Sequence, residues 1–147
     1  MNILDPVSTI MTTNVTSVSP EDTMKKVEEI FQNERFHHLP VVWEGHLVGM
    51  VSKSDYLFFK RGFNDDTTDA RVDLLRLKTR KVKEFMTSGL AHLEPEDKIN
   101  VALEVFKENI FHAIPVVKEG KLVGIVTTLD VIRQLAETGE KTYRLKE

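Results

Sequence analysis

Apolar residues in the first half of the chain follow two different periods. A set with three- and four-residue spacing predicts a helix with one apolar face over residues 24–31. Two β-branched runs, 39–43 and 47–51, flank a turn that contains Glu44-Gly45, and together they predict a hairpin. A short alternating stretch, 15–18, precedes the helix, and a second helix is expected after the hairpin. The pattern therefore predicts the order strand, helix, strand, strand, helix.

The same series returns about 75 residues later without a gap, and roughly 20 of about 51 aligned pairs are identical. Met11-Thr12 aligns with Met86-Thr87. Asp55, near which the last helix of the first copy should begin, aligns with Asp130. In the second copy we expect a strand at 90–93, a helix at 99–106 and a hairpin formed by 114–117 and 122–126. The chain is a tandem duplication, which we divide into a first unit 1–59, a connector 60–81, a second unit 82–136 and a tail 137–147.

Side-chain types within the copies refine these expectations. A Pro-Glu-Asp turn before each first helix places Asp22 and Asp97 where we expect them to cap the helix. The methionine and phenylalanine side chains expected in the core are Met11, Met24, Met50, Met86, Phe31 and Phe106.

A unit of about 50 residues buries too little apolar surface to be stable alone, so the two copies are expected to pack on each other through their sheets. The predicted fold class is therefore α/β (α+β), with two units related by a pseudo-twofold axis. Such a pair has two equivalent clefts between the copies, and clefts of this kind are common small-molecule sites.

Composition narrows the function classes. The chain has 147 residues, 29% of them charged, and no cysteine, which excludes a disulfide framework and a cysteine nucleophile and favours the cytoplasm. No apolar run approaches the ~20 residues of a membrane span, and the first residues do not resemble a secretory signal. A net charge of −3 gives no general electrostatic case for nucleic acid. The glycine-rich phosphate loops and the usual hydrolase and zinc motifs are also missing from the sequence.

The two stretches "LPVVWEGHLVGMVSKSD" and "IPVVKEGKLVGIVTTLD" resemble the ends of cystathionine-β-synthase (CBS) domains, and their duplication resembles the CBS pair called a Bateman module. The resemblance covers about nine tenths of the chain. It implies a regulatory protein without catalytic activity or an obligatory cofactor. Members bind AMP, ADP, ATP, S-adenosylmethionine or NAD in the clefts and pass the ligand state to a partner protein. Free-standing pairs form flat homodimers.

The resemblance also implies which residues line the clefts. Asp55 and Asp130 would bind ribose hydroxyls, which suits a carboxylate acceptor, and the backbone of the short first strand would contact the adenine edge. The serine and threonine hydroxyls would contact ribose or phosphate, and His37 and His112 would contact phosphate. One cleft is expected to join Asp130, Thr127 and His112 to Val15, Thr16, Phe36 and His38. The other is expected to join Asp55, Ser52, Ser54, Lys53 and His37 to Leu90, Ala91, Phe111 and Ala113.

Other interpretations of these residues stay open at this point. Gly49 and Gly124 are expected to let a ligand approach the backbone closely. Asp55 and Asp130 could instead be ordinary helix caps, although one oxygen can cap while the other binds a ligand. The two histidines could be partly exposed polar residues at a strand entrance. The adjacent pair His37-His38 makes a poor metal site, because neighbouring strand side chains point to opposite faces.

Two further alternatives concern the whole protein. The basic residues Arg76, Lys78, Arg80, Lys81 and Lys83 fit a solvated face better than a nucleic-acid contact. The pair could also be a structural dimerisation module with empty clefts. An enzyme would require a converging base and nucleophile, which the sequence does not display.

Overall fold

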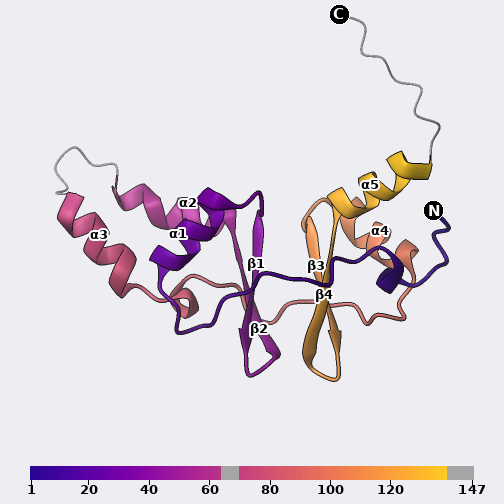
Figure 1. The fold of residues 1–147 in the computed structure, drawn as a ribbon, viewed down its shortest axis with the longest axis horizontal. Helices are drawn as coiled ribbons and strands as arrows, with labels where there is room; N and C mark the ends of the chain where they lie inside the picture. Colours follow the sequence, from indigo (N-terminus) through magenta and orange to yellow (C-terminus); the bar gives the residue numbers. More distant parts are fainter. Residues whose placement is uncertain (64–69, 139–147) are drawn as a thin grey trace, which may run out of the picture. The chain divides into compact units, whose positions relative to one another are not determined.

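The structure, a computed structural model, describes residues 1–63 and 70–138 (Figure 1). Its helices are α1 (Met24–Asn33), α2 (Lys53–Lys60), α3 (Ala70–Thr79), α4 (Ile99–Lys107) and α5 (Thr128–Thr138). Its strands are β1 (His38–Trp43), β2 (His46–Ser52), β3 (Ala113–Lys118) and β4 (Lys121–Thr127). Three short 3-10 turns are η1 (Val7–Thr9), η2 (Arg61–Phe63) and η3 (Val82–Glu84). The predicted mixed α/β class is confirmed.

The two hairpins form as the sequence predicts. Strands β1 and β2 pair antiparallel with Leu39 opposite Val51, and a bulge follows Val41. Both residues of the Glu44-Gly45 turn have positive φ, 50° and 84°, the conformation that two-residue hairpin turns favour. Glu119-Gly120 repeats this turn with φ of 51° and 80°. Strands β3 and β4 are likewise hydrogen-bonded neighbours.

The chain forms two compact units that do not follow the order of the sequence copies. Within the described part of the chain, the copy-one body consists of residues 15–63, 70–91 and 119–122, and the copy-two body consists of residues 1–14, 92–118 and 123–138. The copy-one body holds the β1–β2 hairpin with α1, α2 and α3, and the copy-two body holds α4 and α5. Each hairpin with its helices is thus completed by a segment that belongs to the other copy in the sequence. We call these segments the first strap, residues 3–12, and the second strap, residues 80–87.

Each strap supplies both core and backbone contacts to its body. Val7 of the first strap and Val82 of the second are fully buried, each within the core cluster of its body. The Met24 N–H at the start of α1 donates to the Arg80 carbonyl at 2.8 Å, and the Ile99 N–H at the start of α4 donates to the Asp5 carbonyl at 2.9 Å. The straps therefore satisfy helix N-terminal donors that would otherwise lack a partner.

The prediction that Asp22 and Asp97 cap these helices is wrong. The residues at the cap positions are Thr23 and Lys98, and neither makes a side-chain cap hydrogen bond. The Asp22 carboxylate instead accepts the Ser19 N–H at 2.7 Å, and the Asp97 carboxylate accepts the Glu94 N–H at 2.8 Å. Because each aspartate bonds back across the turn, it closes the turn that leads into the helix.

The straps lie against Gly49 and Gly124, at the positions where the sequence analysis expected the close approach of a ligand. A Cβ at Gly124 would lie 2.6 Å from the Met11 Sδ and 3.1 Å from the Thr12 carbonyl oxygen. A Cβ at Gly49 would lie 2.7 Å from the Met86 Sδ and 2.9 Å from the Thr87 carbonyl oxygen. The glycines are therefore required by the protein's own chain. Thr12 and Ile125 exchange two backbone hydrogen bonds at this crossing, as do Thr87 and Met50.

The predicted first strands and core residues are the remaining sequence predictions to compare with the structure. The expected first strands reduce to single parallel bridges, Val18 with Val41 and Leu93 with Val116, because a turn follows at once and the ladder cannot continue. Met24, Met50 and Phe31 are buried, whereas Met11, Met86 and Phe106 are partly buried against the two cores. Residues 64–69 of the connector and 139–147 of the tail lie outside the described residues. None of the described helices combines the length and apolarity that a membrane span needs.

Ion pairs add to the contacts that hold the second strap. Glu21, in the turn before α1, pairs with Lys81 and, at 2.6 Å, with Lys83. Hydrogen bonds from Lys81 and Lys83 lower the pKa of Glu21 to about 2. The aligned positions of the first strap hold Pro6 and Ser8, which cannot form such pairs. The basic run noted in the sequence is therefore partly neutralised within the copy-one body.

Gly124→Ala should destabilise the protein by roughly 1–3 kcal/mol, because the added methyl group overlaps Met11 and the Thr12 backbone at a crossing that cannot widen without losing hydrogen bonds. Urea unfolding measures the change, and Thr13→Ala, at an exposed position nearby in sequence, serves as the control. An unfolding free energy equal to that of the wild type would contradict the close approach.

Glu21→Gln should lower stability slightly near neutral pH and have no effect near pH 2. The folded pKa lies below the ordinary value, so the ionised carboxylate stabilises the fold above about pH 4.5, and this contribution disappears as pH falls towards about 2. Urea midpoints of both proteins across this range, at low salt, provide the measurement. A difference that grows as the pH falls would refute the assignment.

Candidate functional site

The first candidate site lies at the start of α2. Ser52 ends β2 and is the N-cap of α2, and its Oγ accepts the Asp55 N–H at 3.1 Å. The Asp55 Oδ2 in turn accepts the Ser52 N–H at 2.8 Å and the Ser52 hydroxyl at 2.9 Å. This reciprocal capping box fixes both the helix start and the orientation of the carboxylate.

The start of α5 repeats this arrangement. The Asp130 Oδ2 accepts the Thr127 N–H at 2.7 Å and the Thr127 hydroxyl at 2.6 Å. The Asp130 N–H donates to the Thr127 Oγ1 at 3.2 Å. The alternative in which the aspartates cap their helices is thus partly right, but each is the third residue of its helix, and the residue at the end of the preceding strand accepts the helix N–H.

Only one oxygen of each carboxylate takes part in the capping box. Among residues 1–63 and 70–138, the Asp55 Oδ1 has no hydrogen-bond or ion-pair partner. The Asp130 Oδ1 accepts the Thr12 hydroxyl at 3.3 Å, a contact at the long end of the hydrogen-bonding range. Both aspartates are half-buried. Each therefore presents an oriented carboxylate oxygen with acceptor capacity left over.

The backbone carbonyls of the two predicted histidines contact the helix starts that carry these carboxylates. The His37 carbonyl accepts the Lys53 N–H at 2.8 Å, and the His112 carbonyl accepts the Thr128 N–H at 3.1 Å. These are the first N–H groups of α2 and α5. Both histidine side chains are exposed. The structure thus places each histidine at a helix start, and the proposed phosphate contact of its side chain stays a prediction.

Within the copy-one body the structure brings together Ser52, Lys53, Ser54 and Asp55 with His37 at the start of α2. The same body contains the predicted adenine-contacting residues Val15, Thr16, Phe36, His38, Leu90 and Ala91. The copy-two body contains Phe111, His112 and Ala113 with Thr127 and Asp130. Phe36 and Phe111 are 37% and 47% exposed, so neither ring is taken up by a core. We refer to the two groups around Asp55 and Asp130 as the Asp55 half-site and the Asp130 half-site.

Thr12 is a candidate site residue that the sequence analysis missed. It lies on the first strap, is exposed, and directs its hydroxyl to Asp130. The repeat of Met11-Thr12 as Met86-Thr87 was the available signal, but nothing local indicates that residue 12 meets residue 130. No group of three or more potential metal ligands occurs among the described residues.

A family model for the CBS domain matches residues 7–62 and 82–137. The chain therefore belongs to the CBS domain family and carries two tandem copies of the domain. This match confirms the resemblance seen in the two repeated stretches.

Curated relatives place the pair in longer proteins. The chain is 28% identical over 130 residues to the uncharacterised protein MJ1225 of Methanocaldococcus jannaschii, covering 86% of this chain and 45% of the relative. It is 28% identical over 123 residues to inosine-5'-monophosphate dehydrogenase of the same organism, covering 82% of this chain and 22% of that enzyme. The chain spans less than half the length of these relatives.

Solved structures share the fold. CBSX2, solved in complex with AMP, has a TM-score of 0.75 at 24% identity, and the match covers 90% of this chain and 97% of that chain. MJ1225 of Methanocaldococcus jannaschii, a proposed archaeal homologue of g-AMPK, has a TM-score of 0.77 at 26% identity, covering 92% of this chain and 49% of that chain. CBS-pair proteins of this kind are the structural neighbours of the chain.

Ser52→Ala should cost about 1 kcal/mol of stability, because it removes the N-cap of α2 and one donor to Asp55. Ser54→Ala, an exposed residue of the same helix without a cap role, is the matched control and should be nearly neutral. Guanidinium unfolding of the three proteins compares them. Equal losses in both variants would show that the capping box does not hold this helix start.

Proposed function

We propose that the chain is a regulatory CBS-pair protein that binds an adenosine-containing ligand, of the AMP, ADP, ATP, S-adenosylmethionine or NAD type, at half-sites built on Asp55 and Asp130. The observation that carries this proposal is that the two oxygens of each carboxylate differ in their partners. One oxygen is held by the capping box, and the other is left to accept from a ribose hydroxyl. The solved complex of CBSX2 with AMP and the likeness to MJ1225 support an adenine nucleotide as the ligand.

The surroundings of each carboxylate suit the rest of a nucleotide. A helix start favours a phosphate through its positive dipole end and through any N–H groups still available. In the Asp55 half-site Ser54 and the Lys53 ammonium are exposed and add a donor and a positive charge. In the Asp130 half-site Thr12 adds a hydroxyl beside the carboxylate. The contribution of adenine contacts from the opposite copy stays a prediction of the resemblance.

In this proposal the ligand acts by shifting a conformational equilibrium that a partner protein reads, because a ligand changes populations only through its different affinity for two states. The chain has no catalytic activity of its own in this scheme, and it acts as a homodimer. Relatives such as inosine-5'-monophosphate dehydrogenase are longer, and the matching region is only 22% of that enzyme.

A ligand-free structural module is the second candidate. The observation in its favour is that the capping boxes alone account for the placement of both aspartates. A thermal-shift titration separates the candidates, since a ligand at 100 times its Kd adds ~2.7 kcal/mol to stability. We expect stabilisation by AMP, ATP, NAD or S-adenosylmethionine, and no response to any of the four would favour the structural module.

Asp55→Asn and Asp130→Asn should each weaken AMP binding at one half-site by about 10- to 100-fold, because a charge-assisted hydrogen bond to ribose is lost while the amide oxygen still accepts from the cap. Isothermal titration calorimetry gives affinity and stoichiometry for both variants. Glu108→Ala, which removes an exposed carboxylate outside either half-site, is the control. Unchanged AMP affinity in both asparagine variants would overturn the assignment.

A further inference from the structure

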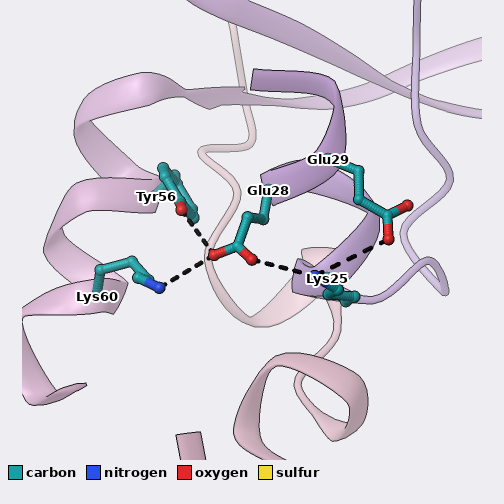
Figure 2. A network of polar contacts seen from close by, with 5 residues as sticks. All are labelled: Lys25, Glu28, Glu29, Tyr56 and Lys60. Atoms are coloured by element: carbon teal, nitrogen blue, oxygen red, sulfur yellow. Dashed lines mark hydrogen bonds and ion pairs between the residues drawn. The ribbon is translucent and has the colours of Figure 1, made fainter. Parts of the chain in front are cut away.

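Glu28 is the one buried charged side chain among the described residues, with 6% of the residue exposed. It projects from α1 towards α2 and accepts three hydrogen bonds (Figure 2). The Tyr56 hydroxyl donates to Oε2 at 2.8 Å, and the Lys60 ammonium donates to the same oxygen at 3.0 Å. The Lys25 ammonium donates to Oε1 at 3.3 Å. We call these four residues the Glu28 network.

The network keeps a carboxylate ionised where burial disfavours charge. Burial raises the pKa of Glu28, but the hydrogen bonds from Tyr56, Lys60 and Lys25 outweigh that effect and leave the pKa below its ordinary value. Burial and the neighbouring Glu28 carboxylate raise the pKa of Tyr56, so the phenol remains a donor. Removing one partner would leave a buried group unpaired, which is costly, so these contacts fix geometry strongly.

The network holds both ends of α2. Tyr56 follows Asp55 directly in the first turn of the helix, and Lys60 is its last residue. The Tyr56 ring also packs against Phe31 of α1, with 5.8 Å between ring centroids. A helix of eight residues is marginal on its own, so its position depends on such tertiary contacts. Because Asp55 and Tyr56 share one turn, a contact that fixes Tyr56 also restrains the helix backbone that carries Asp55, while the capping box orients its carboxylate.

The second copy lacks the network. The positions aligned with Glu28, Tyr56 and Lys60 are Leu103, Val131 and Leu135. Val131 is buried, and Leu103 packs against the core of the copy-two body. Apolar contacts are non-directional, so they allow a helix to shift or rotate at less cost than a set of buried hydrogen bonds does. The start of α5 therefore lacks the buried network that anchors α2 to α1, and its polar contact from outside the helix-and-hairpin pair is the exposed Thr12 hydroxyl on Asp130.

We propose that Glu28 and Tyr56 are positioning residues that pre-order the Asp55 half-site, so that the two half-sites of this duplicated chain differ in their readiness to bind ligand. The ligand part of this inference rests on the proposed function. The ordering of the first turn of α2 does not, and it is measured without ligand.

The decisive variant gives the first copy the residues found at the aligned positions of the second. It carries Glu28→Leu, Tyr56→Val and Lys60→Leu in the full chain. Replacing a buried polar set by apolar residues often preserves folding. In hydrogen exchange followed by mass spectrometry, the first turn of α2 should exchange about tenfold faster than in the wild type, and α5 should not change. Glu28→Gln, which keeps the shape and an acceptor for Tyr56, should give a smaller acceleration. Val41→Ala, a buried β1 variant outside the network, controls for general loss of stability.

The ligand measurement uses AMP and isolates each half-site. When both proteins carry Asp130→Asn, the triple variant should bind AMP about tenfold more weakly than the protein with an intact Glu28 network. When both carry Asp55→Asn, the triple variant and the protein with the intact network should bind AMP equally. The inference would be overturned by any of three results. The triple variant could exchange its α2 amide hydrogens at the wild-type rate, it could exchange them no faster than Val41→Ala does, or it could bind AMP at the Asp55 half-site with unchanged affinity. If neither asparagine background alters AMP binding, the proposed function fails, and the exchange result alone decides whether the network orders α2.

Discussion

The crossing of each strap over a glycine is the contact on which both bodies depend. At Gly49 in β2 and Gly124 in β4 the strap backbone comes so near that a side chain would not fit, and two backbone hydrogen bonds form at each crossing. This crossing places Val7 and Val82 in their cores and brings strap carbonyls onto the first N–H groups of α1 and α4. It also carries Thr12 to Asp130. Core, helix caps and half-site geometry therefore have a common origin in one close approach.

The duplicated units share this frame but have diverged in how they are held. The copy-one body has added polar contacts, in the Glu28 network between α1 and α2 and in the pairs that Glu21 makes with the second strap. In the copy-two body leucine and valine stand at the positions aligned with Glu28, Tyr56 and Lys60, and proline and serine stand at those aligned with Lys81 and Lys83. Glu96, which aligns with Glu21, pairs with Lys118 and not with a strap. Apolar burial supplies stability without fixing one orientation, whereas buried hydrogen bonds specify geometry. The divergence thus separates the start of α2, which the Glu28 network anchors, from the start of α5, which has its capping box and the Thr12 contact but no such network.

The repeating elements could be predicted because their signals are local. The 3.6-residue period of α1 and α4, and the Glu-Gly turns of both hairpins, are determined by neighbouring residues. The exchange of straps could not be predicted, because the pairing of Asp5 with Ile99 depends on contacts between residues far apart in sequence. Thr12 was missed for the same reason. Glu28 looks like a surface residue in the pattern, and its burial depends on Tyr56 and Lys60 of another helix. The aspartate half-sites were located from the repeat. The capping box that orients each carboxylate was missed, although a serine or threonine three residues before the aspartate is its local signal.

The reciprocal exchange of straps makes each body depend on both copies. Each body contains a segment that belongs to the other copy, so the residues of one copy do not account for a complete body. A fragment that ends in the connector would keep the first strap but lose the second, and the copy-one body would then lack Val82 in its core and the Arg80 carbonyl at the start of α1. The covalent chain supplies each strap at a high effective local concentration, so completion of a body does not depend on the concentration of the protein.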